Sequence, residues 1–247
     1  MIRFKHTHSS GFYKGSIQAL HRAVLKYAQT AQVITLTEVA TEGREDALAV
    51  PGFGVVVGDK GLKDDSAIVY DKSVFKVIFH ESYLVSHHLF KLGGHLSSPL
   101  YAQNAVLEHL ESGKRVVVSV CHFPSGVEGD LAHHRHTDRV VAWHQATNNL
   151  RRRSNQLKTH FKTDASILAG DWNINFKHRW ARAAIKVKFP MWKLVWSAVD
   201  RLPSRGTHGS RLIDGAVLKG LKVIAAYVDI DDNSSDHGPW SELLKFI

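Results

Sequence analysis

Several short apolar segments of this sequence end in a polar residue whose side chain could take part in catalysis. The residues are acids, amides or imidazoles: Glu38, His122, Asp171 with Asn173, Asp214, and Asp236 with His237. Strand ends are the places where a rigid scaffold presents side chains to a shared site. One such residue would mean little, but the repeated arrangement predicts a single site assembled from several strand ends.

Asp171 and Asn173 stand two residues apart in Gly170-Asp171-Trp172-Asn173. In an extended chain, residues i and i+2 point to the same face, so both side chains could reach one phosphate group while Trp172 packs behind them. Gly170 would let the backbone approach closely. For this pair alone, an ordinary Asp-Asn turn without chemistry is the alternative.

Glu38 is the best candidate ligand for a hard cation, and Asp236 is a second candidate. Mg²⁺ usually takes one or two protein carboxylates and keeps several waters. Asp236 also stands beside His237, where a carboxylate can orient an imidazole or stabilise its cationic form. A cationic His237 would stabilise charge that develops on phosphate oxygens.

The elements that must position these residues are mostly strands. Period-2 patterns and apolar runs predict strands at 2–8, 33–38, 52–57, 66–70, 74–79, 106–110, 115–121, 166–169, 212–218 and 222–227, and a final edge strand. Helical spacing predicts helices over 16–30, beginning at Ser16, over 130–161, and over part of 177–198 with a break at Pro190. Residues 80–104 have no clear pattern. With no repeat or linker, we expect one domain over 1–247, formed by two packed sheets with helices outside.

The net charge of +9 and the pI of about 9.6 favour a polyanionic partner. Nucleic acid is the first candidate, and an anionic membrane surface or a small phosphorylated substrate is the alternative. The one cysteine, Cys121, excludes an intrachain disulfide and fits a reducing compartment. No apolar segment approaches the length of a transmembrane helix. We therefore expect a cytoplasmic, monomeric protein that does not associate with membranes.

A basic segment that lies between two of the site motifs should border the substrate. Its predicted substrate-binding residues are Lys177, Arg179, Arg205 and Arg211. Trp192 and Trp196 stand at helical i, i+4 spacing, which favours packing on one helix face. Cys121 precedes His122 in a predicted strand, so their side chains point to opposite faces and Cys121 is expected to pack in the core.

Taken in order, these motifs resemble those of the endonuclease/exonuclease/phosphatase superfamily, which includes pancreatic-type deoxyribonucleases and exonuclease-III-like nucleases. The matching pieces run over nearly the whole chain: Thr37-Glu38, Val118-Ser119-Val120-Cys121-His122, Gly170-Asp171-Trp172-Asn173, Leu212-Ile213-Asp214 and Ser235-Asp236-His237. The resemblance implies a four-layer α/β sandwich, in which two mainly antiparallel sheets pack face to face with helices outside. It also implies a site at one end of the two sheets.

The resemblance implies a role for each site residue. Glu38 would bind Mg²⁺, and Asp171 would orient or deprotonate the attacking water. Asn173 would hold a phosphate oxygen, and Asp214 would support the site. His122 and His237 would stabilise the transition state, while Asp236 would orient its histidine or touch the metal.

The first strand departs from the family pattern, which has an asparagine at its end. Here His6 and His8 are the possible first-strand site residues, and we expect His6 to take the asparagine's place. Imidazole is a poorer Mg²⁺ partner than a carbonyl oxygen, so Mn²⁺ or another divalent ion is the alternative cofactor.

These observations predict a divalent-metal-dependent nuclease that hydrolyses phosphodiester bonds by one-step water attack, on DNA more than on RNA. Two alternatives stay open. One is a phosphomonoesterase or phospholipase-type enzyme that acts on a small phosphorylated substrate. The other is a catalytically silent member of the fold that binds nucleic acid.

Overall fold

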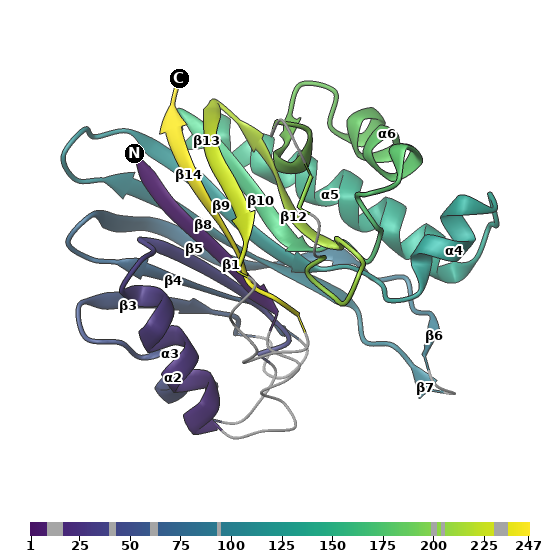
Figure 1. Cartoon of the computed structure of the whole chain (residues 1–247), viewed down its shortest axis with the longest axis horizontal. Coiled ribbons are helices and arrows are strands. Elements are labelled where there is room, and N and C mark those ends of the chain that lie inside the picture. The colour runs from purple at the N-terminus through teal and green to yellow at the C-terminus, as the bar shows by residue number, and fades with distance from the viewer. Residues whose placement is uncertain are drawn as a thin grey trace.

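Two six-stranded β-sheets pack face to face, and helices cover their outer faces (Figure 1). The structure is a computed structural model, which describes residues 1–8, 17–39, 43–59, 64–92, 95–198, 202–203, 206–229 and 237–247. The helix–sheet–sheet–helix layering confirms the predicted four-layer α/β sandwich.

The first sheet has the strand order β13-β14-β1-β2-β4-β3. Its strands are β1 (Ile2–His8), β2 (Val33–Thr37), β3 (Phe53–Val57), β4 (Ala67–Asp71), β13 (Leu221–Val228) and β14 (Trp240–Phe246). β1 and β2 are parallel, and the other pairs are antiparallel. The carboxyl ends of β1 and β2 therefore lie at the same end of the sheet as the amino ends of β4 and β14.

The second sheet has the order β11-β12-β10-β9-β8-β5. Its strands are β5 (Phe75–Ser86), β8 (Leu100–His109), β9 (Arg115–His122), β10 (Ala165–Asp171), β11 (Lys193–Leu194) and β12 (Asp214–Lys219). β9 and β10 are parallel, and β12 is antiparallel to β10, so that Asp171 is paired in register with both His122 and Asp214. A separate hairpin joins β6 (Lys91–Leu92) to β7 (His95–Leu96).

The helices pack through apolar faces at helical spacing. They are α2 (Ile17–Ala28), α3 (Arg44–Leu48), α4 (Val127–Ala132), α5 (Asp138–His160), α6 (Arg179–Lys188) and the short 3₁₀ helix η2 (Val195–Ser197). Leu20, Val24 and Tyr27 of α2 are buried against the first sheet. Thr137 is the N-cap of α5, and its hydroxyl accepts a hydrogen bond from the Val140 amide at 3.4 Å. None of the helices described is long and apolar enough to cross a membrane.

The core lies between the sheets and extends under α5. β9 and β10 are central strands covered on both faces, so Val116 through Cys121 form a continuous buried run instead of an alternating one. The buried Cys121 confirms the prediction that this residue packs in the core.

Three sequence-based expectations about elements need correction. The patternless region 80–104 contains most of β5 and the start of β8, because register shifts at Val77/Phe79 and Leu84/Ser86 break the alternation of β5. Trp192 and Trp196 are buried as expected, but they do not share a helix, since α6 ends at Lys188. The last strand is not an edge strand: β14 lies between β13 and β1.

Candidate active site

The polar residues predicted at the strand ends come together at one end of the sandwich. Glu38 follows β2, while His122 and Asp171 end β9 and β10. His122 Nε2 lies 3.7 Å from Glu38 Oε1 and 3.8 Å from Asp171 Oδ2. Strands from both sheets therefore deliver carboxylates to a single imidazole.

Local backbone geometry fixes the two acidic strand ends. Asp171 Oδ1 accepts a hydrogen bond from the Asn173 amide at 2.8 Å, and Asn173 Nδ2 donates to the Phe123 carbonyl at 2.9 Å. Asn173 and Glu38 have left-handed φ angles of 53° and 58°, which are uncommon for non-glycine residues and collect at functional sites. Gly170 is required for a different reason, since a Cβ there would lie 1.9 Å from the Cys121 carbonyl oxygen.

His122 is bound by a carboxylate that the sequence analysis missed. Its Nδ1 lies 2.8 Å from Asp65 Oδ2. Burial would lower the pKa of His122, but Asp65, Asp171 and Glu38 together raise this pKa to about 10. The imidazole is therefore cationic at neutral pH.

Asp65 is held in place by a buried polar cluster around its neighbour Asp64. Asp64 Oδ2 accepts hydrogen bonds from the Ser82 hydroxyl, at 2.5 Å, and from the Gln103 amide. The Arg44 guanidinium donates to the backbone carbonyl of Asp64. Burial raises the pKa of Asp64 despite these donors. The cluster fastens the segment before β4 to both sheets, which fixes Asp65 beside His122.

The Asp214 carboxylate lies between the imidazoles of His237 and His6. Its Oδ2 lies 2.8 Å from His237 Nδ1, and its Oδ1 lies 3.4 Å from His6 Nε2. Burial would raise the pKa of Asp214, but His237 and His6 hold this pKa well below its usual range. The Thr207 hydroxyl accepts a hydrogen bond from the Asp214 amide at 3.1 Å, and Trp196 Nε1 donates to the Asp214 carbonyl at 2.7 Å. Asp214 is thus a buried carboxylate whose position is determined on every side.

Comparison with known proteins shows which fold presents this site. No family model matches the sequence, and no curated protein matches it. Among solved structures, an endonuclease/exonuclease/phosphatase from Bacteroides vulgatus is 15% identical, covers 100% of this chain and 99% of its own, and has a TM-score of 0.75. A Bacteroides thetaiotaomicron mannosyl-6-phosphatase is 15% identical and covers 100% of both chains, with a TM-score of 0.73. D. rerio TDP2 complexed with single strand DNA product is 14% identical and covers 99% and 98%, with a TM-score of 0.71.

This chain has the endonuclease/exonuclease/phosphatase fold. The finding confirms the resemblance predicted from the motifs.

The two histidines of β1 lie at different positions along this strand of the endonuclease/exonuclease/phosphatase fold. β1 continues to His8, which is paired in register with Thr37, directly before Glu38. His6 lies two residues earlier, fully buried, with its Nδ1 2.8 Å from Thr35 Oγ1. The position at the strand end is therefore that of His8, and His6 instead contacts Asp214.

The four predicted substrate-binding cations lie in different surroundings. Lys177 lies between β10 and α6, and Arg179 is exposed at the first residue of α6. Arg211 forms an ion pair with Glu128, which compensates its charge. Arg205 and Asp236 lie outside the described residues.

Two further residues escaped the sequence analysis. His208 packs its ring on that of His237, with the ring centroids 4.6 Å apart. Thr207 supports Asp214, as described above. Both lie in an irregular segment without periodicity, so only the contacts of the folded chain identify them.

Three buried side chains at this end of the sandwich could together hold a metal ion. Oxygen or nitrogen atoms of Asp171, Asp214 and His237 lie within 4.8 Å of one another, and all three residues are buried. Glu38 adds a carboxylate that is 31% exposed. Such a donor set, rich in carboxylate oxygens, fits a hard divalent cation.

Proposed function

We propose that this protein hydrolyses phosphodiester bonds of nucleic acid, DNA more than RNA, by one-step attack of water with the help of a divalent cation. The observation that carries the proposal is the convergence of Glu38, Asp171 and Asn173 with two aspartate-bound imidazoles, His122 and His237, at one end of the sandwich. The net charge of +9 and a structural neighbour complexed with single strand DNA support nucleic acid as the substrate.

The cation would be held by Glu38 and the neighbouring Asp171, with Asp236 as the further ligand expected from the sequence. Mg²⁺ is our first choice because carboxylate oxygens dominate this donor set, and Mn²⁺ is the alternative because imidazole nitrogens lie close by. When bound, the ion would neutralise charge that develops on the phosphate oxygens.

Asp171 is the residue that would orient the attacking water and accept its proton. The Asn173 amide holds Oδ1, and Oδ2 faces His122 at 3.8 Å. The carboxylate is 3% exposed and has little freedom to rotate away. Positioned general base help of this type contributes about 10²–10⁴ in rate.

The two imidazoles and Asn173 would stabilise the transition state. His122 is held by Asp65 and is cationic in the metal-free protein, where Asp65, Asp171 and Glu38 raise its pKa to about 10, and its imidazole would donate to a phosphate oxygen. Asp214 Oδ2 lies 2.8 Å from Nδ1 of His237 and orients this imidazole, which would donate to a phosphate oxygen. Asn173 uses one amide hydrogen on Phe123, and the second is free to donate to phosphate.

A phosphomonoesterase acting on a small phosphorylated substrate is the second candidate. It is favoured by the mannosyl-6-phosphatase neighbour, which aligns over the whole of both chains. The two candidates differ in salt dependence, because nucleic acid binding releases counterions and weakens steeply with salt. A small substrate would show a much shallower dependence.

The test is cleavage of plasmid, linear duplex, single-stranded DNA and RNA, with a sugar phosphate as the monoester, each with Mg²⁺, Mn²⁺ or chelator. We expect metal-dependent cleavage of nucleic acid, which Asp171→Ala lowers by about 10²–10⁴. The matched control is Asp46→Ala, which removes an exposed carboxylate on α3 and should leave the rate unchanged. Full activity of Asp171→Ala would refute the assignment, and turnover of the monoester alone would favour the second candidate.

A further inference from the structure

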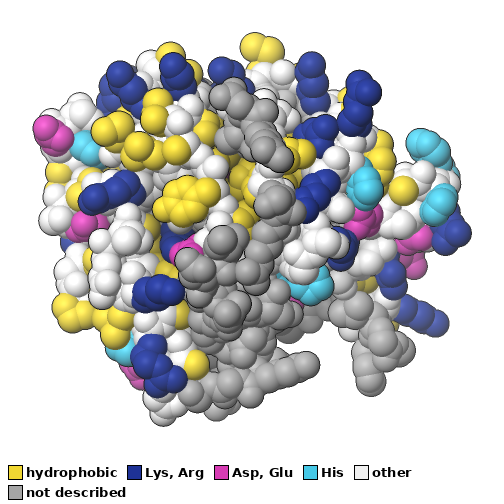
Figure 2. All heavy atoms as spheres, viewed as in Figure 1, with side chains coloured by type: hydrophobic (Ala, Val, Ile, Leu, Met, Phe, Trp, Pro, Cys, Tyr) yellow, Lys and Arg dark blue, Asp and Glu magenta, His cyan; other side chains and the backbone are white. Residues whose placement is uncertain are grey.

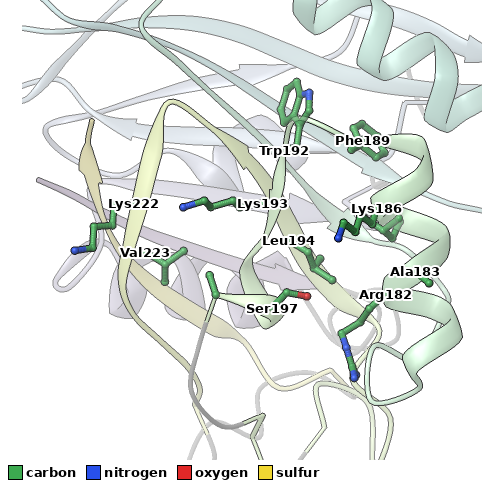
Figure 3. A pocket seen from close by; sticks show the side chains of 12 residues that line it. Arg182, Ala183, Lys186, Phe189, Trp192, Lys193, Leu194, Ser197, Lys222 and Val223 are labelled. Atoms are coloured by element: carbon green, nitrogen blue, oxygen red, sulfur yellow. The ribbon is translucent and has the colours of Figure 1, made fainter.

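A cavity of about 520 Å³ lies on the flank of the sandwich, apart from the catalytic residues. Arg182 and Lys186 extend from α6 on one side, and Lys193 of β11 and Lys222 of β13 lie across from them (Figure 3). Leu194 is among the apolar residues that line it. The cavity therefore joins the edges of both sheets to one helix.

Every charged side chain that lines this cavity is cationic. Lys186, Lys193 and Lys222 are exposed, and none of them forms an ion pair with any residue in the described ranges. Arg182 is different, because its guanidinium donates to the Phe176 and Lys177 carbonyls and braces the segment after β10. Three exposed lysines thus line a concave surface that has no carboxylate among its lining residues.

A like-charge pair adds to this field. Lys222 is paired in register with Lys245 across β13 and β14, and both side chains are exposed. Like charges in directly opposite positions destabilise a sheet, and a bound anion would relieve that repulsion. In the space-filling view, Lys and Arg side chains gather along the upper margin of this face of the molecule (Figure 2).

The cavity adjoins the wall of the catalytic site. Ser197 lines the cavity, and the preceding residue, Trp196, donates its indole hydrogen to the Asp214 carbonyl. Lys222 and Val228 lie near opposite ends of β13. They are six positions apart along the chain, which corresponds to about 20 Å at roughly 3.3 Å per residue. A ligand lying in the cavity would therefore extend away from the catalytic residues along the edge of the sandwich.

We propose that this basic groove binds the sugar-phosphate backbone of a single strand of nucleic acid, several nucleotides from the bond that is cleaved. The inference rests on the proposed function in taking nucleic acid as the substrate. Grooves that track single strands combine cationic side chains with aromatic ones, and here Trp192 lines the cavity with Lys193 and Lys222. The volume falls in the range of small-ligand pockets, roughly 300–1,000 Å³, which a flexible strand can enter and a stiff duplex cannot.

The experiment compares Lys193→Glu/Lys222→Glu with a matched control, Lys72→Glu/Lys76→Glu. The control makes the same charge change near β5, at the opposite edge of the second sheet from β11. Fluorescence anisotropy with a labelled single-stranded 20-mer in chelator measures binding without cleavage. We expect the groove variant to bind at least tenfold more weakly and to lose about 1.4 from the salt slope, at roughly 0.7 per phosphate contact. Circular dichroism melting shows that both variants are folded.

The same proteins separate this proposal from the proposed function. The groove variant should hydrolyse bis(4-nitrophenyl) phosphate as fast as wild type, since no catalytic residue is changed. Wild type that binds the 20-mer but cleaves nothing would refute the proposed function and leave the groove supported. Equal binding of the 20-mer by the groove variant and the control would overturn the groove proposal. So would loss of binding to phosphatidylserine vesicles with unchanged binding to the 20-mer.

Discussion

The two aspartate–histidine pairs of the site make the same contact in different surroundings. His122 with Asp65 and His237 with Asp214 both have an Nδ1–Oδ2 distance of 2.8 Å. The Asp65 side chain is 28% exposed and lies in a group of carboxylates, whereas that of Asp214 is 1% exposed. The contact alone therefore does not determine what each pair does.

The two pairs differ in whether the histidine or the aspartate is surrounded by several groups of the opposite charge. One imidazole, His122, is surrounded by Asp65, Asp171 and Glu38, so the positive charge is fixed on the histidine and its pKa is raised. One carboxylate, Asp214, lies between two imidazoles, so the negative charge is fixed on the aspartate and its pKa is lowered. The first pair supplies a cation to the site, and the second supplies a rigid support for His237.

The largest effect should come from breaking the buried pair with Asp214→Asn. An amide cannot accept from both imidazoles at once, so His237 would lose its fixed tautomer and orientation. We expect a decrease in kcat of about 10³–10⁴, similar in size to that for the equivalent change in a serine protease triad. Single-turnover kinetics measure the chemical step, and Thr207→Ser, which keeps the hydroxyl, serves as the control. A loss below tenfold would show that the pair does not orient His237.

Asp65→Asn tests the exposed pair and should have a smaller effect. Without that carboxylate the pKa of His122 should fall from about 10 toward its ordinary value of 6.5. NMR titration of the imidazole in metal-free protein measures this shift. We expect a smaller rate reduction near pH 8 than for Asp214→Asn, because only Asp171 and Glu38 remain beside the imidazole and less of His122 is cationic than in wild type. An unchanged titration midpoint would show that Asp65 does not raise the pKa of His122.

The raised pKa of His122 also has a consequence for stability. Because the folded state binds this proton more tightly than the unfolded state, the contribution is fully present below about pH 6.5 and is lost as pH rises through about 10. The stability difference between wild type and Asp65→Asn should therefore be largest in mild acid and shrink toward pH 10. Urea unfolding at several pH values measures it.

Glu242 is a buried carboxylate with no histidine among its hydrogen-bond partners in the described residues. It is 3% exposed in β14, neither of its oxygens forms a hydrogen bond within the described chain, and burial raises its pKa well above 4.5. Glu242→Leu should stabilise the protein by about 1–3 kcal/mol at neutral pH. The gain should grow as pH rises above about 4.5, because wild type loses stability there as its unfolded state releases the proton. Thermal unfolding checks this, and a destabilised variant would reveal a partner for Glu242.

Cys121→Ala should have the smallest effect. The thiol precedes His122 but lies in the core between the sheets, and burial raises its pKa further. Cleavage rates should stay within twofold of wild type, with a stability loss of about 1 kcal/mol. A large rate loss without unfolding would mean that the thiol, and not only the imidazole beside it, serves the chemistry.

The predicted site residues that lie together in the structure share one property: they stand at the ends of strands with strong apolar patterns. Glu38, His122 and Asp171 could be read from the sequence because an apolar run that stops at a polar residue marks a strand end. Asp214 could be read because it interrupts an apolar run, and it is the first residue of β12. The structure brings all four together.

The residues that were missed depend on pairing between distant segments. Asp65 precedes a predicted strand and does not end one, and only the antiparallel pairing of β4 with β2 puts it beside His122. His6 was assigned to the strand end because register cannot be read from one strand alone. The interior position of β14 likewise depends on β13 and β1 both pairing with it, which its own residues do not reveal.

The position of β14 has a consequence for the timing of synthesis. β1 has β14 as one of its two neighbours, and Ile2 is paired with Leu244. A ribosome-bound chain that had emerged only as far as β13 would lack both this strand and His237, and β1 would present an open edge. Contacts between such distant segments form slowly. The proposed phosphoester cleavage should therefore begin only after β14 has paired with β1 and His237 has reached Asp214.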